Sequence, residues 1–212
     1  MPRIVFVTFR PKTRLLKPTE AIPAQKQGAR SNVKFGISVN SEKEAADHYE
    51  KARKNLLEIN RWQEMAGKLS AAFVLTDPHG MPAQRLPLQG DYIRIHLPTA
   101  ADTKFEWVRI EAIEEQRPNE QSAWIMIRVR PSDPPRKQEE TEHFFSKEAT
   151  SSFYIERKGR KIVASVQGRN ELPNLHAPDA GSTIRNLLIS LGAMLGLNYP
   201  QWKGLVKGLL NA

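Results

Sequence analysis

The chain has 212 residues, of which 40% are hydrophobic, a size that suits one domain with its own core. It contains no cysteine, which excludes disulfide bonds, thiolate nucleophiles and cysteine-bound metal sites. The formal net charge of +9 divides into +6 for residues 1–31 (seven basic, one acidic), −2 for residues 32–157 (18 basic, 20 acidic) and +5 for residues 158–212 (seven basic, two acidic), so the basicity lies at the two ends.

Residues 1–31 are predicted to form a basic N-terminal arm. They hold one short candidate strand, Ile4 to Phe9, followed by a stretch with three prolines and no sustained periodicity. From Val33 to Val39 apolar and polar residues alternate, the period of a half-buried strand. We therefore expect a single domain over residues 32–212.

A helix is predicted to follow this first strand. Ser41 and Glu44 have the spacing of a capping box, in which the Glu44 carboxylate would reach back to the Ser41 amide, so the helix should begin at Glu42. An apolar face then repeats at spacings of three and four residues. Asn60 interrupts it, and about one more turn, which contains Trp62, precedes a stop at Gly67.

Strand candidates come next in close succession, each bounded by turn residues. A polar, proline-bearing insertion at 131–149 separates the first four from a final hairpin, in which Gly159 can supply the positive φ of the turn. The candidates are 69–76, 91–97, 105–115, 122–130, 152–157 and 161–167.

The chain is predicted to end in a long helix. Apolar residues repeat at helical spacing from Ile184 to Leu195 and again from Trp202 to Leu210. Gly196 and the residues before Pro200 punctuate the pattern, so we expect a bend or break near Asn198.

This order of elements over residues 33–212 resembles the helix-grip fold of the START-like (SRPBCC) superfamily. The resemblance implies an α+β domain: a curved antiparallel sheet of about seven strands wrapped around a long C-terminal helix, with one or two short helices after strand one. In that superfamily the space between sheet and helix often holds lipids, polyketides, hormones or other apolar molecules. An antiparallel sheet with flanking helices in another topology fits much of the same pattern.

On this reading, one face of the sheet and the last helix line a cavity, with Trp62 at its end. The same side chains would form an ordinary core if they pack directly against one another, and the sequence does not separate these readings. The cavity candidates are Tyr49, Trp62, Phe73, Ile93, Ile95, Val108, Ile110, Ile125, Ile127, Phe153, Leu187, Leu188, Leu191 and Met194.

The opposite face combines aromatic residues with arginines, a composition found at interface hot spots. Alternation places Tyr92, Trp107, Trp124 and Met126 there. These interface candidates are either covered by the N-terminal strand or a second subunit, or they form a bare binding face.

The preferred function is non-enzymatic binding or carriage of a small hydrophobic or amphipathic, lipid-like ligand. The alternatives are a ligand-free interaction module that uses the outer face, and a cyclase- or hydratase-type enzyme that uses the same cavity. No catalytic motif, cofactor motif or metal-binding histidine spacing is present. We expect no cofactor and no membrane span, a cytoplasmic protein, a homodimer as one arrangement, and weak, non-specific polyanion binding through the basic ends.

Overall fold

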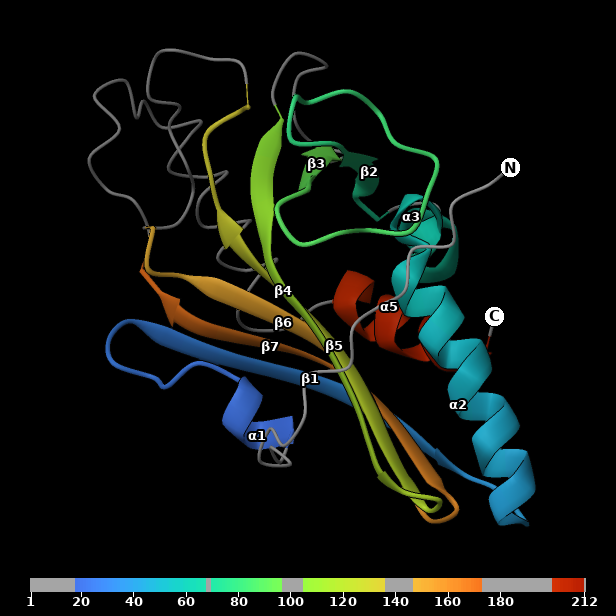
Figure 1. The fold of residues 1–212 in the computed structure, drawn as a ribbon. Coiled ribbons are helices and arrows are strands. Elements are labelled where there is room, and N and C mark those ends of the chain that lie inside the picture. Colours follow the sequence, from blue (N-terminus) through green and yellow to red (C-terminus); the bar gives the residue numbers. More distant parts are fainter. Residues whose placement is uncertain (1–17, 68–69, 97–104, 136–146, 173–199, 212) are drawn as a thin grey trace.

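A computed structural model describes residues 18–67, 70–96, 105–135, 147–172 and 200–211. Seven strands form one antiparallel sheet in the order β1-β7-β6-β5-β4-β3-β2 (Figure 1). The strands are β1 (Ala29–Ser38), β2 (Ala72–Thr76), β3 (Tyr92–His96), β4 (Glu106–Asn119), β5 (Ser122–Pro131), β6 (Thr150–Lys158) and β7 (Lys161–Glu171). The predicted α+β class and the seven-stranded antiparallel sheet are confirmed.

The first long helix begins where its capping box predicts. Ser41 is the N-cap of α2 (Glu42–Leu57), and its hydroxyl accepts from the Glu44 amide at 3.1 Å. The Glu44 carboxylate accepts from the amide of Asn40 at 3.0 Å, not from that of Ser41 as predicted. The other helices are α1 (Pro18–Ala21), η1 (Ile59–Arg61), α3 (Trp62–Ala66) and α5 (Pro200–Asn211).

The first and last strands are neighbours and are longer than their alternation predicted. β1 begins at Ala29 and β7 ends at Glu171, and these two residues face each other in the register. Each strand supplies the hydrogen-bonding edge that extends the other, which is a tertiary effect. The pairing of residues 33–38 with β7 places the N-terminal strand in the main sheet, as the resemblance implies.

Helices α2, α3 and α5 cover one face of the sheet, which we call the inner face, while α1 lies on the other face. α5 contacts α2, α3, β1 and β7, and α2 also contacts β6 (Figure 1). Trp62, in α3, stands between them, with its ring centroid 4.7 Å from that of Phe153 and 5.5 Å from that of Phe73. Trp202, in α5, lies 5.4 Å from Phe153 and joins the same aromatic cluster.

Three predictions fall outside the described residues. They are the strand at 4–9, the helix from Ile184 with its break near Asn198, and most of the insertion at 131–149. Of the predicted terminal helix, the structure describes α5.

Candidate functional site

The inner face is a continuous apolar surface. Ile110, Ile127 and Ile155 are fully buried there and pack in one cluster with Trp62. Ile95 and Val108, on β3 and β4, are only partly buried but belong to the same surface. Val33, Phe35 and Ile37 on β1 and Ile113 on β4 are partly buried as well, so the helices cover the inner face unevenly.

The ten described cavity candidates lie together on this surface. Eight of them, including Tyr49, are at most 5% exposed. The other two, Ile95 and Val108, are partly buried. The four others, Leu187, Leu188, Leu191 and Met194, lie outside the described residues. A ligand-binding role for any of them stays a prediction.

Tyr49 brings a polar atom to the apolar cluster. Its ring is 1% exposed, and its hydroxyl is buried with no hydrogen-bond partner in the described part of the chain. Burial, and then the nearby Glu115 carboxylate, raises the pKa of Tyr49 above its usual range. Because the hydroxyl stays protonated, it can donate to a polar group of a ligand.

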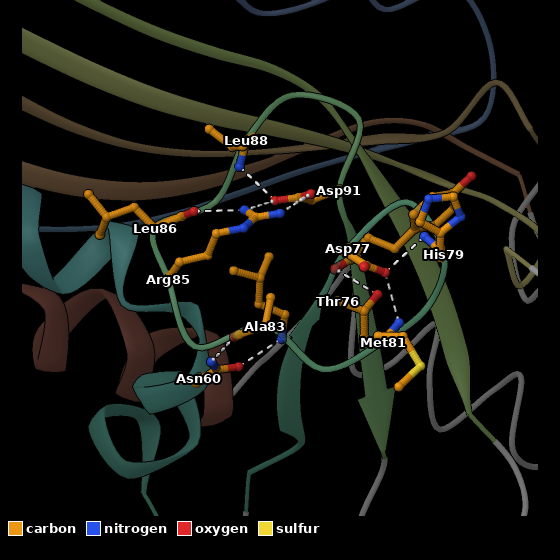
Figure 2. Close-up of polar contacts among 12 residues, drawn as sticks. Asn60, Thr76, Asp77, His79, Met81, Ala83, Arg85, Leu86, Leu88 and Asp91 are labelled. Carbon is orange, nitrogen blue, oxygen red and sulfur yellow. Dashed lines mark hydrogen bonds and ion pairs between the residues drawn. The ribbon is translucent and has the colours of Figure 1, made fainter. Parts of the chain in front are cut away.

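The loop between β2 and β3 is held by side-chain hydrogen bonds (Figure 2) and exposes several apolar side chains. Asn60 donates to the Ala83 carbonyl at 2.8 Å and accepts from the Leu75 amide at 2.7 Å. Asp91 is 1% exposed and accepts two hydrogen bonds from the Arg85 guanidinium, at 2.6 and 2.9 Å. The exposed apolar residues of this loop are Met81, Leu86 and Leu88.

The outer face is partly covered. Trp124 and Met126 are 2% and 1% exposed and pack with Tyr154 beneath Ala21 and Ile22 of the N-terminal segment. Two other interface candidates, Tyr92 and Trp107, are partly exposed and meet edge to face, with ring centroids 6.5 Å apart. An interface through these four residues stays a prediction.

The outer face also has a polar region that was not predicted from the sequence. Gln167 and Arg169 lie beside Arg128 and Arg130 around one cavity. Arg169 donates to the carbonyls of Ser31 and Gly168 and to the Gln167 side chain. The sequence carries no signal for it, because residues 167–171 (QGRNE) contain no apolar side chain whose alternation could assign Arg169 to a face.

The described residues contain neither a metal-binding cluster nor a membrane-spanning helix. No group of three or more His, Asp or Glu side chains there could hold a metal ion. Within the same residues, no helix has both the length and the apolar character needed to cross a bilayer.

Comparison with solved structures finds distant likenesses at low TM-scores. Major latex-like protein 151 from Panax ginseng is 10% identical over 86% of this chain and 97% of its own, with a TM-score of 0.37. The di-domain ARO/CYC protein StfQ from the steffimycin biosynthetic pathway is 12% identical over 85% of this chain and 49% of its own (TM-score 0.39). Ara h 8.0201 is 13% identical over 86% of this chain and all of its own (TM-score 0.33).

These values are too low to carry any inference about function from those proteins to this chain. No protein-family model matches the sequence, and no curated protein sequence matches it. The helix-grip resemblance rests on the chain itself, on its strand order and on the placement of α2 and α5 on one face of the sheet.

Proposed function

We propose that the protein binds a small apolar or amphipathic molecule on the inner face of β3 and β4, between the sheet and a long C-terminal helix that the sheet wraps around. One observation carries this proposal: Ile95 and Val108, on the adjacent strands β3 and β4, are partly buried members of the inner apolar cluster. A ligand lying on them would extend the existing core.

The physical driving force is the removal of apolar surface from water. Covering roughly 300 Å² of apolar ligand surface stabilises the complex by about 7.5 kcal/mol before the costs of association are subtracted. Ile95 and Val108 supply the accessible contact surface, and their cross-strand neighbours Phe73 and Ile93 are already buried beside them.

The experiment is a fluorescence titration of the full chain with a dansyl-labelled fatty acid. The Val108→Trp variant places an indole on the proposed surface, and Val74→Trp places the same group on the opposite face of the neighbouring strand β2 as a control. We expect saturable binding by the parent, at least tenfold weaker binding by Val108→Trp, and binding within about twofold of the parent by Val74→Trp.

Both variants need circular dichroism and thermal unfolding to show that they fold. No binding by the parent, or unchanged binding by a folded Val108→Trp variant, would reject this site. A protein that stays ligand-free and forms a dimer of defined mass in native mass spectrometry would favour the interaction module.

A further inference from the structure

The outer face holds a cavity of about 800 Å³ between residues 20–25 and strands β1, β4, β5 and β7. We call it the outer-face cavity. Its volume lies in the range of small-molecule sites, roughly 300–1,000 Å³. It lies on the side of the sheet opposite to α2 and α5.

Two sets of contacts hold the wall of this cavity in place. Arg128 donates to the Ala21 carbonyl at 2.9 Å. Ala21 and Ile22 also pack against Trp124, Met126 and Tyr154. The Asn170 side chain donates to the Ala24 carbonyl at 3.2 Å and accepts from the Lys26 amide at 2.7 Å. The cavity is thus bounded by a segment fixed at both ends.

The register of the sheet places a row of polar side chains on the outer face, across neighbouring strands. Arg128 faces Ser152 on β6, Ser152 faces Gln167 on β7, and Gln167 faces Asn32 on β1. Opposed residues in an antiparallel sheet share a face, so this row of four residues crosses four strands on the outer side. The Ser152 hydroxyl in its middle is buried and has no hydrogen-bond partner among the described residues.

A bulge adds a further arginine. The register of β1 and β7 shifts between Ala29 and Ser31, and Asn170 opposite takes a positive φ of 56°. Bulges redirect side chains, and here Arg30 lines the cavity beside Arg169. Arg30 lies close enough that, after burial, its charge lowers the pKa of Arg169.

The lining carries an excess of positive charge. Four arginines, at 30, 128, 130 and 169, face two carboxylates, Glu20 and Glu111, which leaves +2. Glu111 pairs with both Arg128 and Arg130. In the described structure no carboxylate forms an ion pair with Arg30 or Arg169, although Arg169 is only 6% exposed.

Arg169 lines the cavity and has unused hydrogen-bond donors. Its Nη1 donates to two backbone carbonyls and its Nη2 to Gln167 Oε1, so two of its five N–H groups have no partner among the described residues. The nearest acid, Glu171, compensates weakly, because burial raises the pKa of its carboxyl to about 7. A buried guanidinium with free N–H groups beside a second arginine is a matched receptor for an oxyanion.

We propose that the outer-face cavity binds a small anionic molecule through a phosphate or carboxylate group held by Arg30 and Arg169. This site is separate from the apolar site on the inner face. Its ligand enters from the outer side, and the carboxamides of Asn32 and Gln167 lie within the same lining.

Isothermal titration calorimetry of the full chain at about 150 mM sodium chloride tests the proposal, with inorganic phosphate and citrate as probes. At this ionic strength, distant surface charges are largely screened. Saturable binding of either probe supports the site; phosphate alone indicates a phosphoryl ligand, and citrate alone a carboxylate ligand. Binding of neither probe at millimolar concentration overturns it.

Variants separate the site from general charge. Arg30→Gln removes an exposed arginine of the lining, and we expect roughly tenfold weaker binding, the loss typical of one charged hydrogen bond. Arg160→Gln removes the same charge from the exposed β6–β7 turn, at the other end of β7, and should change binding by less than twofold. If binding weakens equally in the two variants, the loss reflects net charge alone, and the site is rejected.

Arg169→Gln gives an independent measurement, since this residue is buried and its loss can also affect folding. A folded Arg169→Gln protein should show no saturable binding up to ten times the dissociation constant of the parent. Parent-like binding by that variant would contradict the proposal. If Arg169→Gln does not fold, the comparison of binding by Arg30→Gln with binding by Arg160→Gln still tests the proposal.

Discussion

Gly208 of α5 lies directly against the backbone carbonyl oxygen of Met65 in α3, with no room between them for a Cβ atom. Gly204, one turn earlier, lies in the same way against the carbonyl of Ala66. The two glycines form a flat strip on which α3 rests, and this strip sets how closely α5 approaches the helices around Trp62.

Gly208→Ala should destabilise the protein by about 1–3 kcal/mol, because the added methyl group must push α3 and α5 apart. In open space the same change would stabilise a helix by roughly 1 kcal/mol, so the sign of the effect identifies the contact. Urea unfolding measures it, and Lys203→Ala, exposed on the same helix, should stay within about 0.5 kcal/mol of the parent. A more stable Gly208→Ala protein would contradict the close approach.

Trp62→Phe should lower the free energy of unfolding by about 2–4 kcal/mol. The indole is fully buried between Phe73 and Phe153, and its Nε1 donates to the Leu56 carbonyl at 3.1 Å. The phenyl ring leaves a void and an unpaired buried carbonyl. The matched change Trp107→Phe, at a partly exposed site, should cost less than about 1 kcal/mol in the same denaturant titration; equal losses would mean that Trp62 is not packed as described.

Arg85→Ala should destabilise the β2–β3 loop by about 1–3 kcal/mol, because it leaves the buried Asp91 carboxylate without its cation. The double variant Arg85→Ala/Asp91→Asn should regain part of this loss, since an amide has no charge to bury. Hydrogen exchange at the Leu88 amide, which donates to Asp91 at 2.8 Å, reports the same event locally. No recovery in the double variant would show that the charge is not the cause.

Glu171 makes stability depend on pH. Burial raises the pKa of Glu171 to about 7 from a usual value of 4.5, while the hydrogen bond from Ser31 and the charge of Arg169 oppose this rise. Between these two pH values the folded protein holds a proton that the unfolded chain releases. The stability linked to this proton is therefore complete below about pH 4.5 and is lost as the pH rises through 7.

Thermal unfolding at pH 5 and pH 8 tests this sign. From pH 5 to pH 8 the parent should lose about 1–3 kcal/mol relative to Glu171→Gln, which has no such proton. Glu120→Gln, an exposed residue of the β4–β5 turn, serves as the control and should follow the parent. Parallel pH profiles for the parent and Glu171→Gln would contradict the prediction.

Local chemistry predicted much of the fold. The Ser41 cap, the alternation from Val33 and the positive φ of Gly159 each depend on neighbours a few residues away, and the structure has all three. The order of these elements led to the seven-stranded antiparallel sheet. The apolar residues of the inner face could be assigned in the same way, because a strand places alternate side chains on opposite sides.

Distant pairing decided the rest. β1 and β7 extend each other beyond their predicted ends, and the bulge at Arg30 with the left-handed Asn170 brings arginines from 139 positions apart in the chain to one cavity. Alternation cannot predict such a bulge, because it adds a residue out of phase. The sequence by itself determined the order of the seven strands and of α2 along the chain and which face of the sheet is apolar. The tertiary structure decided that Trp124 and Met126 are covered, that glycines join α5 to α3, and that Arg30 meets Arg169, since each depends on contacts between segments that no local pattern relates.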